Sequence, residues 1–207
     1  MRAVRRVMPT AGCHVPAAVL GDSVTAAWVR AQGVAVVACG DDDLDRVQAV
    51  AVRPVHVILR CGTETETIRR AVGRGVVRFI ASTPYQVEML SRCALRTKFV
   101  YLDEKAPAVF GEHRLQIVGL HGDVDLSVGV LEWGAAAERL LCRAALMKTC
   151  GMPLSRISLT GGSAAAWRSG DAAALAAVAS VVDEALDEGC ARWRLPRPTV
   201  TLSPLTE

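Results

Sequence analysis

Short apolar runs recur along the chain and alternate with stretches in which apolar residues follow a helical period. Seven of these runs predict strands, at residues 34–39, 55–61, 76–81, 98–102, 117–121, 157–160 and 200–203. An eighth lies at residues 13–20, where Pro16 predicts an irregular strand. Most of the runs are apolar throughout rather than at every second position. This pattern is typical of parallel strands that are covered on both faces.

Helix start signals precede the stretches between these runs. Three aspartates at residues 41–43 precede a predicted helix at 44–50, residues 63–66 precede one at 68–72, and Ser82, Thr83 and Pro84 precede one at 87–92. Two longer helices are predicted at residues 131–148 and 171–188, the second ending at Gly189. Eight strands and about seven helices predict a (β/α)8 TIM-type barrel of parallel strands. An open doubly wound sheet gives the same pattern, and the poor first strand leaves open whether the barrel closes completely.

The amino-acid composition indicates a single folded domain and argues against nucleic-acid binding and membrane insertion. Hydrophobic residues make up 51% of the 207 residues, and no linker or low-complexity stretch divides the chain, which predicts one domain over residues 1–207. The net charge of +3 gives no electrostatic case for nucleic acid. The longest apolar runs are strand-sized, so we expect neither a signal peptide nor a membrane span. Seven cysteines without CxxC spacing indicate reduced thiols, and the cytoplasm is the expected location.

Candidate chemistry lies just after the predicted strands, because ligands of such folds bind beyond the carboxyl ends of the strands. Gly161, Gly162 and Ser163 predict a site for phosphate or another small anion, although a plain turn explains them as well. His121, Asp123 and Asp125 form a polar cluster whose two carboxylates and imidazole are suited to metal binding or acid–base chemistry, although a structural, hydrogen-bonded histidine explains His121 better. The aspartates at 41–43, with Asp45, are better explained by helix capping than by a cation, so no metal site is predicted.

The order of several strand-end segments resembles a known family from about residue 25 onward. Residues 75–92 read GVVRFIASTPYQVEMLSR and resemble the family's fourth strand and the helix after it. Residues 117–125, IVGLHGDVD, resemble GLHxHIGS, and residues 157–163, ISLTGGS, resemble LDxGGG. Residues 198–206, PTVTLSPLT, lie where the family has a strand ending in EPGR. The chain thus resembles the barrel domain of the fold-type III decarboxylases that depend on pyridoxal phosphate, including ornithine, diaminopimelate and arginine decarboxylases, and more distantly alanine racemase.

That resemblance implies a cofactor bound to a lysine at the end of the first strand, but here the position falls near Ala18. The chain has three lysines: Lys98 begins a strand, Lys148 lies in a helix, and Lys105 alone follows a strand's carboxyl end. Lys105 is therefore the only conceivable substitute.

Other family positions also differ. The family's histidine that stacks on the cofactor maps to Asp123, with His121 retained beside it. The acid at the ring nitrogen maps to Ser203 and the arginine of EPGR to Thr206. The family's β-rich domain, which completes the active site across a dimer interface, has no counterpart.

These departures predict a pseudoenzyme, a decarboxylase-like barrel that has lost its cofactor chemistry and binds a small anionic ligand or a protein partner. It would hold no cofactor, or pyridoxal phosphate bound non-covalently by His121 and by Gly161, Gly162 and Ser163. The alternative is an active pyridoxal-phosphate enzyme with a rearranged active site that uses Lys105, or another lyase built on His121, Asp123 and Asp125. The family's dimers further suggest a homodimer, or a heteromer with an active decarboxylase paralogue. Neither nucleic acid nor a membrane is an expected partner.

Overall fold

A computed structural model describes residues 2–108, 111, 114–125, 129–162, 167 and 171–205. They form two compact units, which we name after their strands. The β1–β5 unit comprises residues 14–118, and the β6–β8 unit combines residues 2–13 with residues 119–205. The chain passes from the first unit to the second within strand β6. The prediction of a single domain over residues 1–207 stays a prediction.

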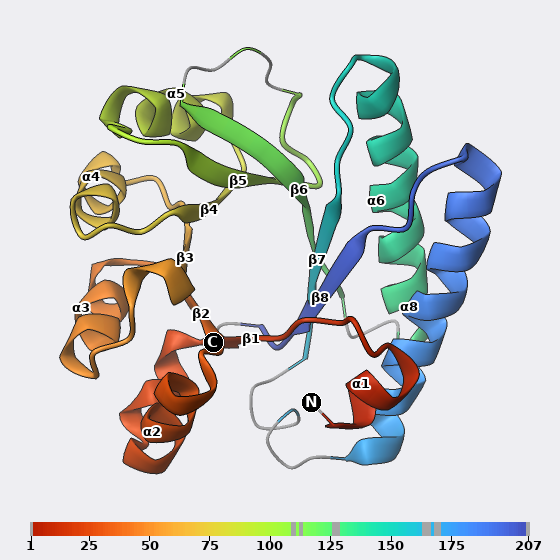
Figure 1. Ribbon diagram of the computed structural model, residues 1–207, viewed down its shortest axis with the longest axis horizontal. Coiled ribbons are helices and arrows are strands. Elements are labelled where there is room, and N and C mark those ends of the chain that lie inside the picture. Colours follow the sequence, from red (N-terminus) through yellow and green to blue (C-terminus); the bar gives the residue numbers. More distant parts are fainter. Residues whose placement is uncertain are drawn as a thin grey trace. The chain divides into compact units, whose positions relative to one another are not determined.

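The β1–β5 unit is a run of parallel strands, each followed by a helix as far as β4. Its helices lie on one side of its strands (Figure 1). The strands are β1 (His14–Pro16), β2 (Ala35–Ala38), β3 (Val57–Arg60), β4 (Arg78–Ala81), β5 (Lys98–Asp103) and the start of β6 (Leu115–Asp123). The helices are α2 (Ser23–Gln32), α3 (Asp41–Ala49), α4 (Thr65–Gly73) and α5 (Pro84–Cys93), with short 3-10 helices at Ala17–Gly21 and Pro54–His56.

Local sequence explains where these helices begin. Asp22 caps α2 by accepting hydrogen bonds from the backbone amides of Val24 and Thr25. Thr83 and Gln86 form a capping box around Pro84 at the start of α5. The face of the strands opposite the helices carries an apolar cluster made by Ala35, Val37, Ile58, Ile80 and Tyr101, with Val118 packed against it. The predicted parallel strands, buried on both faces, are therefore present in this unit.

The β6–β8 unit contains the end of β6 with β7 (Arg156–Thr160) and β8 (Thr199–Ser203), again parallel. Its helices are α1 (Arg2–Val7), α6 (Leu131–Thr149) and α8 (Ala172–Trp193). Helices α6 and α8 lie side by side, and α1 lies beside α8 (Figure 1). Gly12 forms a parallel bridge with Thr201, so the segment before β1 runs along β8.

Several element boundaries needed correction. The strand predicted at residues 55–61 is only Val57–Arg60, because Pro54–His56 form a 3-10 helix. The strand predicted at residues 13–20 is only His14–Pro16, because the chain turns into a 3-10 helix at Ala17. Gly189 does not end the last helix, which continues to Trp193. A Cβ at Gly189 would lie 2.5 Å from Cδ1 of Leu141 on α6. This glycine therefore permits the close approach of α6 and α8 rather than marking a helix end.

The class of the fold agrees with the prediction. Eight strands follow one another in sequence order and alternate with helices, which defines an α/β fold of the TIM-barrel type. Among the described residues, no helix is both long and apolar enough to span a membrane.

Candidate functional site

Polar side chains occupy one face of β6, β7 and β8. In register, His121 lies opposite Ser158, which lies opposite Thr201, and one step further along the strands Asp123, Thr160 and Ser203 form a second row. Between the two rows lie Gly122 on β6 and the fully buried Leu159 and Leu202, and Leu120, just before His121, is also fully buried. Since successive side chains of a strand point to opposite faces, the leucines face the helices and the polar rows face away from them.

His121 is the centre of a buried hydrogen-bond chain. Its side chain is 1% exposed, its Nδ1 lies 3.2 Å from the hydroxyl of Ser158, and its Nε2 lies 3.3 Å from Oδ1 of Asp123. With Asp123 ionised and the imidazole neutral, Nε2 donates to Asp123 and Nδ1 accepts from Ser158. Ser158 is also 1% exposed, whereas the side chain of Asp123 is 40% exposed. These hydrogen bonds therefore hold the imidazole of His121 in place and leave the carboxylate of Asp123 accessible.

Ser203, which the sequence resemblance aligns with the family's ring-nitrogen acid, is also held inside the protein. Its hydroxyl lies 3.0 Å from that of Thr160, and Ser203 is 2% exposed. The backbone carbonyl of Leu159 lies 3.5 Å from the same hydroxyl, at the limit of a hydrogen bond. A serine hydroxyl carries no negative charge, so Ser203 cannot stabilise a protonated ring nitrogen as a carboxylate does.

The glycine turn after β7 packs tightly against aromatic rings. A Cβ at Gly161 would lie 2.8 Å from Cζ2 of Trp133, and the Gly161 carbonyl accepts a hydrogen bond from Nε1 of Trp167. The two indole rings are 6.0 Å apart. The amide of Gly161 donates to the carbonyl of Ser203, and Gly162 has a φ of +76°. Gly161 thus leaves room for the indole of Trp133, and its amide is used in a hydrogen bond to the backbone of β8. Ser163 lies outside the described residues, so the predicted anion site stays a prediction carried by Gly162 and Ser163.

The resemblance implies a lysine at the end of β1, so the structure of this segment and the positions of the three lysines test whether an amine is available there. Pro16 ends β1, and Ala17 and Ala18 begin the 3-10 helix that follows. Lys98 starts β5, is 6% exposed and donates from Nζ to the carbonyl of Val76, while burial and the nearby Arg96 lower the pKa of its amine.

The other two lysines lie outside the strands. Lys148, in α6, donates from Nζ to the carbonyl of Arg194. Lys105 is exposed in the turn after β5, and its backbone amide donates to Asp103. The prediction that Lys105 follows a strand's carboxyl end is confirmed.

A Schiff-base cofactor does not fit the residues described at these positions. The end of β1 supplies no amine, the stacking position holds a carboxylate bonded to His121, and the ring-nitrogen position holds a hydroxyl bonded to Thr160. No chemical step is therefore assigned to pyridoxal phosphate in this chain.

The aspartates at the start of α3 make protein contacts. Asp43 accepts hydrogen bonds from the backbone amide of Cys39 and from Arg46. Asp45 accepts from both Arg70 and Arg74, and these hydrogen bonds lower the pKa of its carboxyl group. These aspartates are therefore paired with arginines and with the backbone before the helix, but Gly40 is the N-cap of α3 and has no side-chain cap hydrogen bond, so the predicted side-chain cap is not present.

Ser158, Thr160 and Thr201 were missed as site residues, although the sequence carries a signal for them. Residues 156–160 read RISLT and residues 199–203 read TVTLS, with a polar residue at every second position. Such alternation predicts one apolar and one polar face. Treating these runs as apolar throughout hid the polar rows that hold His121 and Asp123.

Comparison with known proteins identifies the fold. No family model matches the sequence, and no curated protein matches it. Among solved structures, lysine/ornithine decarboxylase from Vibrio vulnificus, complexed with putrescine, superposes with a TM-score of 0.74 at 16% identity, covering 98% of this chain and 59% of that one. SrLDC in complex with PLP and cadaverine gives 0.72 at 14% identity, covering 98% and 56%.

Diaminopimelate decarboxylase from M. jannaschi gives a TM-score of 0.76 at 10% identity, covering 94% of this chain and 53% of that one. This chain thus spans between half and two thirds of the length of these enzymes. The predicted resemblance is confirmed for the fold, which is that of the barrels of pyridoxal-phosphate-dependent decarboxylases.

Proposed function

We propose that this chain is a catalytically degenerate decarboxylase-like barrel, a pseudoenzyme that binds a small anionic ligand at the carboxyl ends of its strands. The observation that carries the proposal is the end of β1, where Pro16, Ala17 and Ala18 offer no amine. Without an amine there, the covalent link that the decarboxylases of this fold require is missing.

The remaining lysines support this proposal. Lys98 lies at the amino end of β5, away from the edge where ligands of barrel enzymes bind, and its amine is committed to a buried carbonyl. Lys148 belongs to a helix. Lys105 follows β5, but it is exposed, and only its backbone is tied to the turn by Asp103. An exposed amine lacks the fixed geometry of a Schiff-base lysine.

The polar rows support a binding role. Thr160, Thr201, Ser158 and Ser203 place hydroxyl groups on one face, and hydroxyls bind neutral or anionic oxygens without adding charge. Gly162 opens the loop after β7 with a positive φ, a conformation in which successive backbone amides can converge on an anion. We therefore expect a phosphate-bearing or carboxylate-bearing ligand, bound without a covalent bond, in a protein that acts in the cytoplasm.

The first test is covalent capture. The protein is incubated with pyridoxal phosphate, reduced with borohydride and digested, and adducts on the three lysines are measured by mass spectrometry. We expect weak labelling of all three lysines, with the most exposed side chain labelled most. A stoichiometric adduct on Lys105 that Lys105→Arg abolishes, and that the control Lys148→Arg leaves unchanged, would overturn the proposal.

Non-covalent binding is tested separately. Calorimetric titration with pyridoxal phosphate, pyridoxal and inorganic phosphate should give binding that requires the phosphate group, and Ser163→Ala should weaken it. If neither phosphate compound binds a folded sample, the small-anion part of the proposal fails. The pseudoenzyme would then act by binding a protein partner, either as a homodimer or as a heteromer with an active decarboxylase paralogue. Light scattering of the chain alone and of its mixtures with decarboxylases measures which of these forms.

One observation favours a second candidate, an active enzyme. Ser158, His121 and Asp123 form a hydrogen-bonded chain that ends in an accessible carboxylate, and Asp125 is exposed two residues further on. Such a chain suits general acid–base chemistry at Asp123. If turnover of any substrate is found, Asp123→Ala should abolish it with the fold intact, whereas Asp125→Ala should reduce it less.

A further inference from the structure

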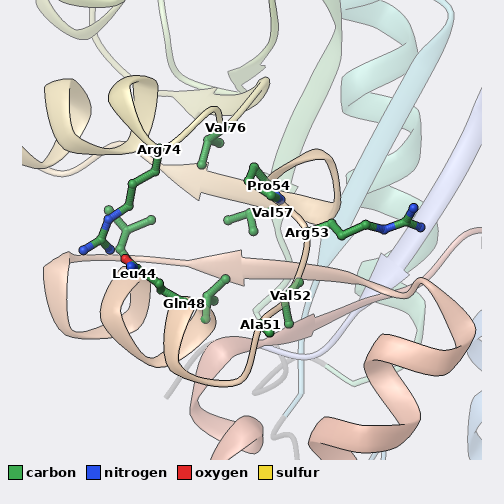
Figure 2. A pocket seen from close by; sticks show the side chains of 10 residues that line it. Leu44, Gln48, Ala51, Val52, Arg53, Pro54, Val57, Arg74 and Val76 are labelled. Carbon is green, nitrogen blue, oxygen red and sulfur yellow. The ribbon is translucent and has the colours of Figure 1, made fainter.

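A hollow lies in the β1–β5 unit, at the amino ends of β3 and β4. It has a volume of about 500 Å³ and lies between the ends of α3 and α4 (Figure 2). Most of its lining is aliphatic: Leu44, Val47, Ala51, Val52, Pro54, Val57 and Val76. Its size and apolar walls are those of a small-molecule site, in which a few polar groups set the orientation of the ligand.

The polar groups of this hollow have one sign. Besides the neutral Gln48, the lining contains two arginines, Arg53 and Arg74, and no acidic residue. Arg53 extends away from the other lining side chains in Figure 2, and Arg74 pairs with Asp45 through Nη2. The preference of the hollow for an anion therefore rests on the second terminal nitrogen of Arg74.

Arg74 has an unused donor. Its Nη2 lies 2.7 Å from Oδ1 of Asp45, and Asp45 also accepts from Arg70, so one carboxylate serves two guanidinium groups. The other terminal nitrogen of Arg74, Nη1, is buried and has no hydrogen-bond partner among the described residues. A buried, charged donor without an acceptor is costly, and a carboxylate is the acceptor that a guanidinium binds best.

Gln48 lines the same hollow as Arg74. Gln48 follows Asp45 by three residues in α3, so both lie on the same face of the helix. Figure 2 shows Gln48, Leu44 and Arg74 at the same end of the hollow. Gln48 is exposed and its side chain is flexible, so a ligand can displace its amide and reach Nη1 of Arg74.

From these observations we infer that the hollow binds a small amphipathic carboxylate, with its alkyl chain against Val47, Val57 and Val76 and its carboxylate on Arg74. This site is separate from the polar rows of β6–β8 and needs no part of the proposed pseudoenzyme function. Its occupant is a free alkyl carboxylate, for which octanoate is the probe.

The test is a methyl NMR titration of the full chain with octanoate, octanol, octylammonium and acetate. Octanoate should shift the methyl signals of Leu44, Val47 and Val57. Acetate, which lacks the chain, and octanol, which lacks the charge, should each bind at least about tenfold more weakly. Octylammonium should not bind. If octylammonium or octanol matches octanoate, or if the shifts lie elsewhere, the inference is wrong.

Variants locate the carboxylate. Arg74→Gln should weaken octanoate binding about tenfold or more and leave octanol binding unchanged. The matched control is Arg69→Gln, which removes an exposed arginine of the same helix that pairs with Glu66 and does not line the hollow. Gln48→Ala should strengthen octanoate binding, because it removes a side chain at the Arg74 end of the hollow, a gain that damaged folding does not produce. Equal effects of Arg74→Gln and Arg69→Gln, or weaker binding by Gln48→Ala, would refute the assignment.

Discussion

Ser158→Ala tests whether the polar rows of β6–β8 are a fixed hydrogen-bond network. The substitution removes the hydroxyl that lies 3.2 Å from Nδ1 of His121. Both residues are 1% exposed, so water does not replace the lost donor at this site. A buried acceptor left without its partner costs about 1–3 kcal/mol, and we expect Ser158→Ala to lower the free energy of unfolding by this amount.

The assay is urea unfolding followed by tryptophan fluorescence in a Trp28→Phe background. Trp28 is the one tryptophan of the β1–β5 unit, so the remaining three report the β6–β8 unit. The matched control is Ser180→Ala at an exposed position of α8, which should change the free energy of unfolding by less than about 0.5 kcal/mol.

A double-mutant cycle separates the hydrogen bond from other effects of the substitution. In a His121→Leu background the acceptor is gone, so Ser158→Ala should cost clearly less than in the wild-type chain. Equal costs in both backgrounds would show that Ser158 does not act through His121. A cost below about 0.5 kcal/mol in the wild-type chain would show that Nδ1 finds another partner.

Further predictions concern packing, pH and thiols. Gly161→Ala should destabilise the protein by about 1–3 kcal/mol in the same urea assay, because its methyl group would overlap the indole beneath it. Gly73→Ala, whose methyl group meets open space in α4, should change stability by less than about 1 kcal/mol. Burial and nearby arginines lower the pKa of His56 below 6.5, so the unfolded chain takes up a proton that the folded chain does not. Stability should therefore fall as the pH falls below about 6.5, and thermal melts of His56→Gln at pH 7 and pH 5 should show a smaller loss than the wild type. Burial raises the pKa of the Cys61 thiol to about 12, so mass spectrometry after alkylation at pH 8 should find Cys61 far less modified than the exposed Cys150.

Much of the β1–β5 unit could be predicted because its signals are local. Apolar runs such as residues 76–81 end in turn and capping residues, and Thr83 with Pro84 marks the start of α5. The start of α3 was placed three residues late, because Asp41 to Asp43 were taken as residues before the helix rather than as its first turn. Each of these features depends on neighbouring residues, which the sequence displays directly.

Features set by tertiary packing were harder to predict. Gly189 has the local signature of a helix end, but the approach of Leu141 from α6 requires a glycine inside the helix. The same reasoning applies to Gly161, whose place under Trp133 depends on a residue nearly thirty positions earlier. Such contacts join residues that are far apart in the sequence, so rules based on neighbouring residues do not predict them.

The candidate site was predicted only in part. His121 and Asp123 follow from the strand-end rule, and the structure brings them together at 3.3 Å. Their partner Ser158 lies in the next strand, and only the parallel register of β6 and β7 makes the two neighbours. The unpaired donor of Arg74 depends on the sharing of Asp45 between two arginines, which no sequence pattern expresses.

For the proposed pseudoenzyme, the polar rows explain how a decarboxylase-like fold would persist without the residues of decarboxylase chemistry. Leu159 and Leu202 are fully buried on the helix-facing side of β7 and β8, while Thr160 and Ser203 alternate with them on the other side. Burial of the leucines supplies the hydrophobic stabilisation, and it does not depend on which polar groups occupy the opposite face. Replacing a carboxylate by the hydroxyl of Ser203 removes a buried charge and adds a hydrogen bond to Thr160, a change that the strand tolerates. Stability and chemistry are therefore carried by different faces of the same strands, and the chemistry can be lost while the barrel strands remain.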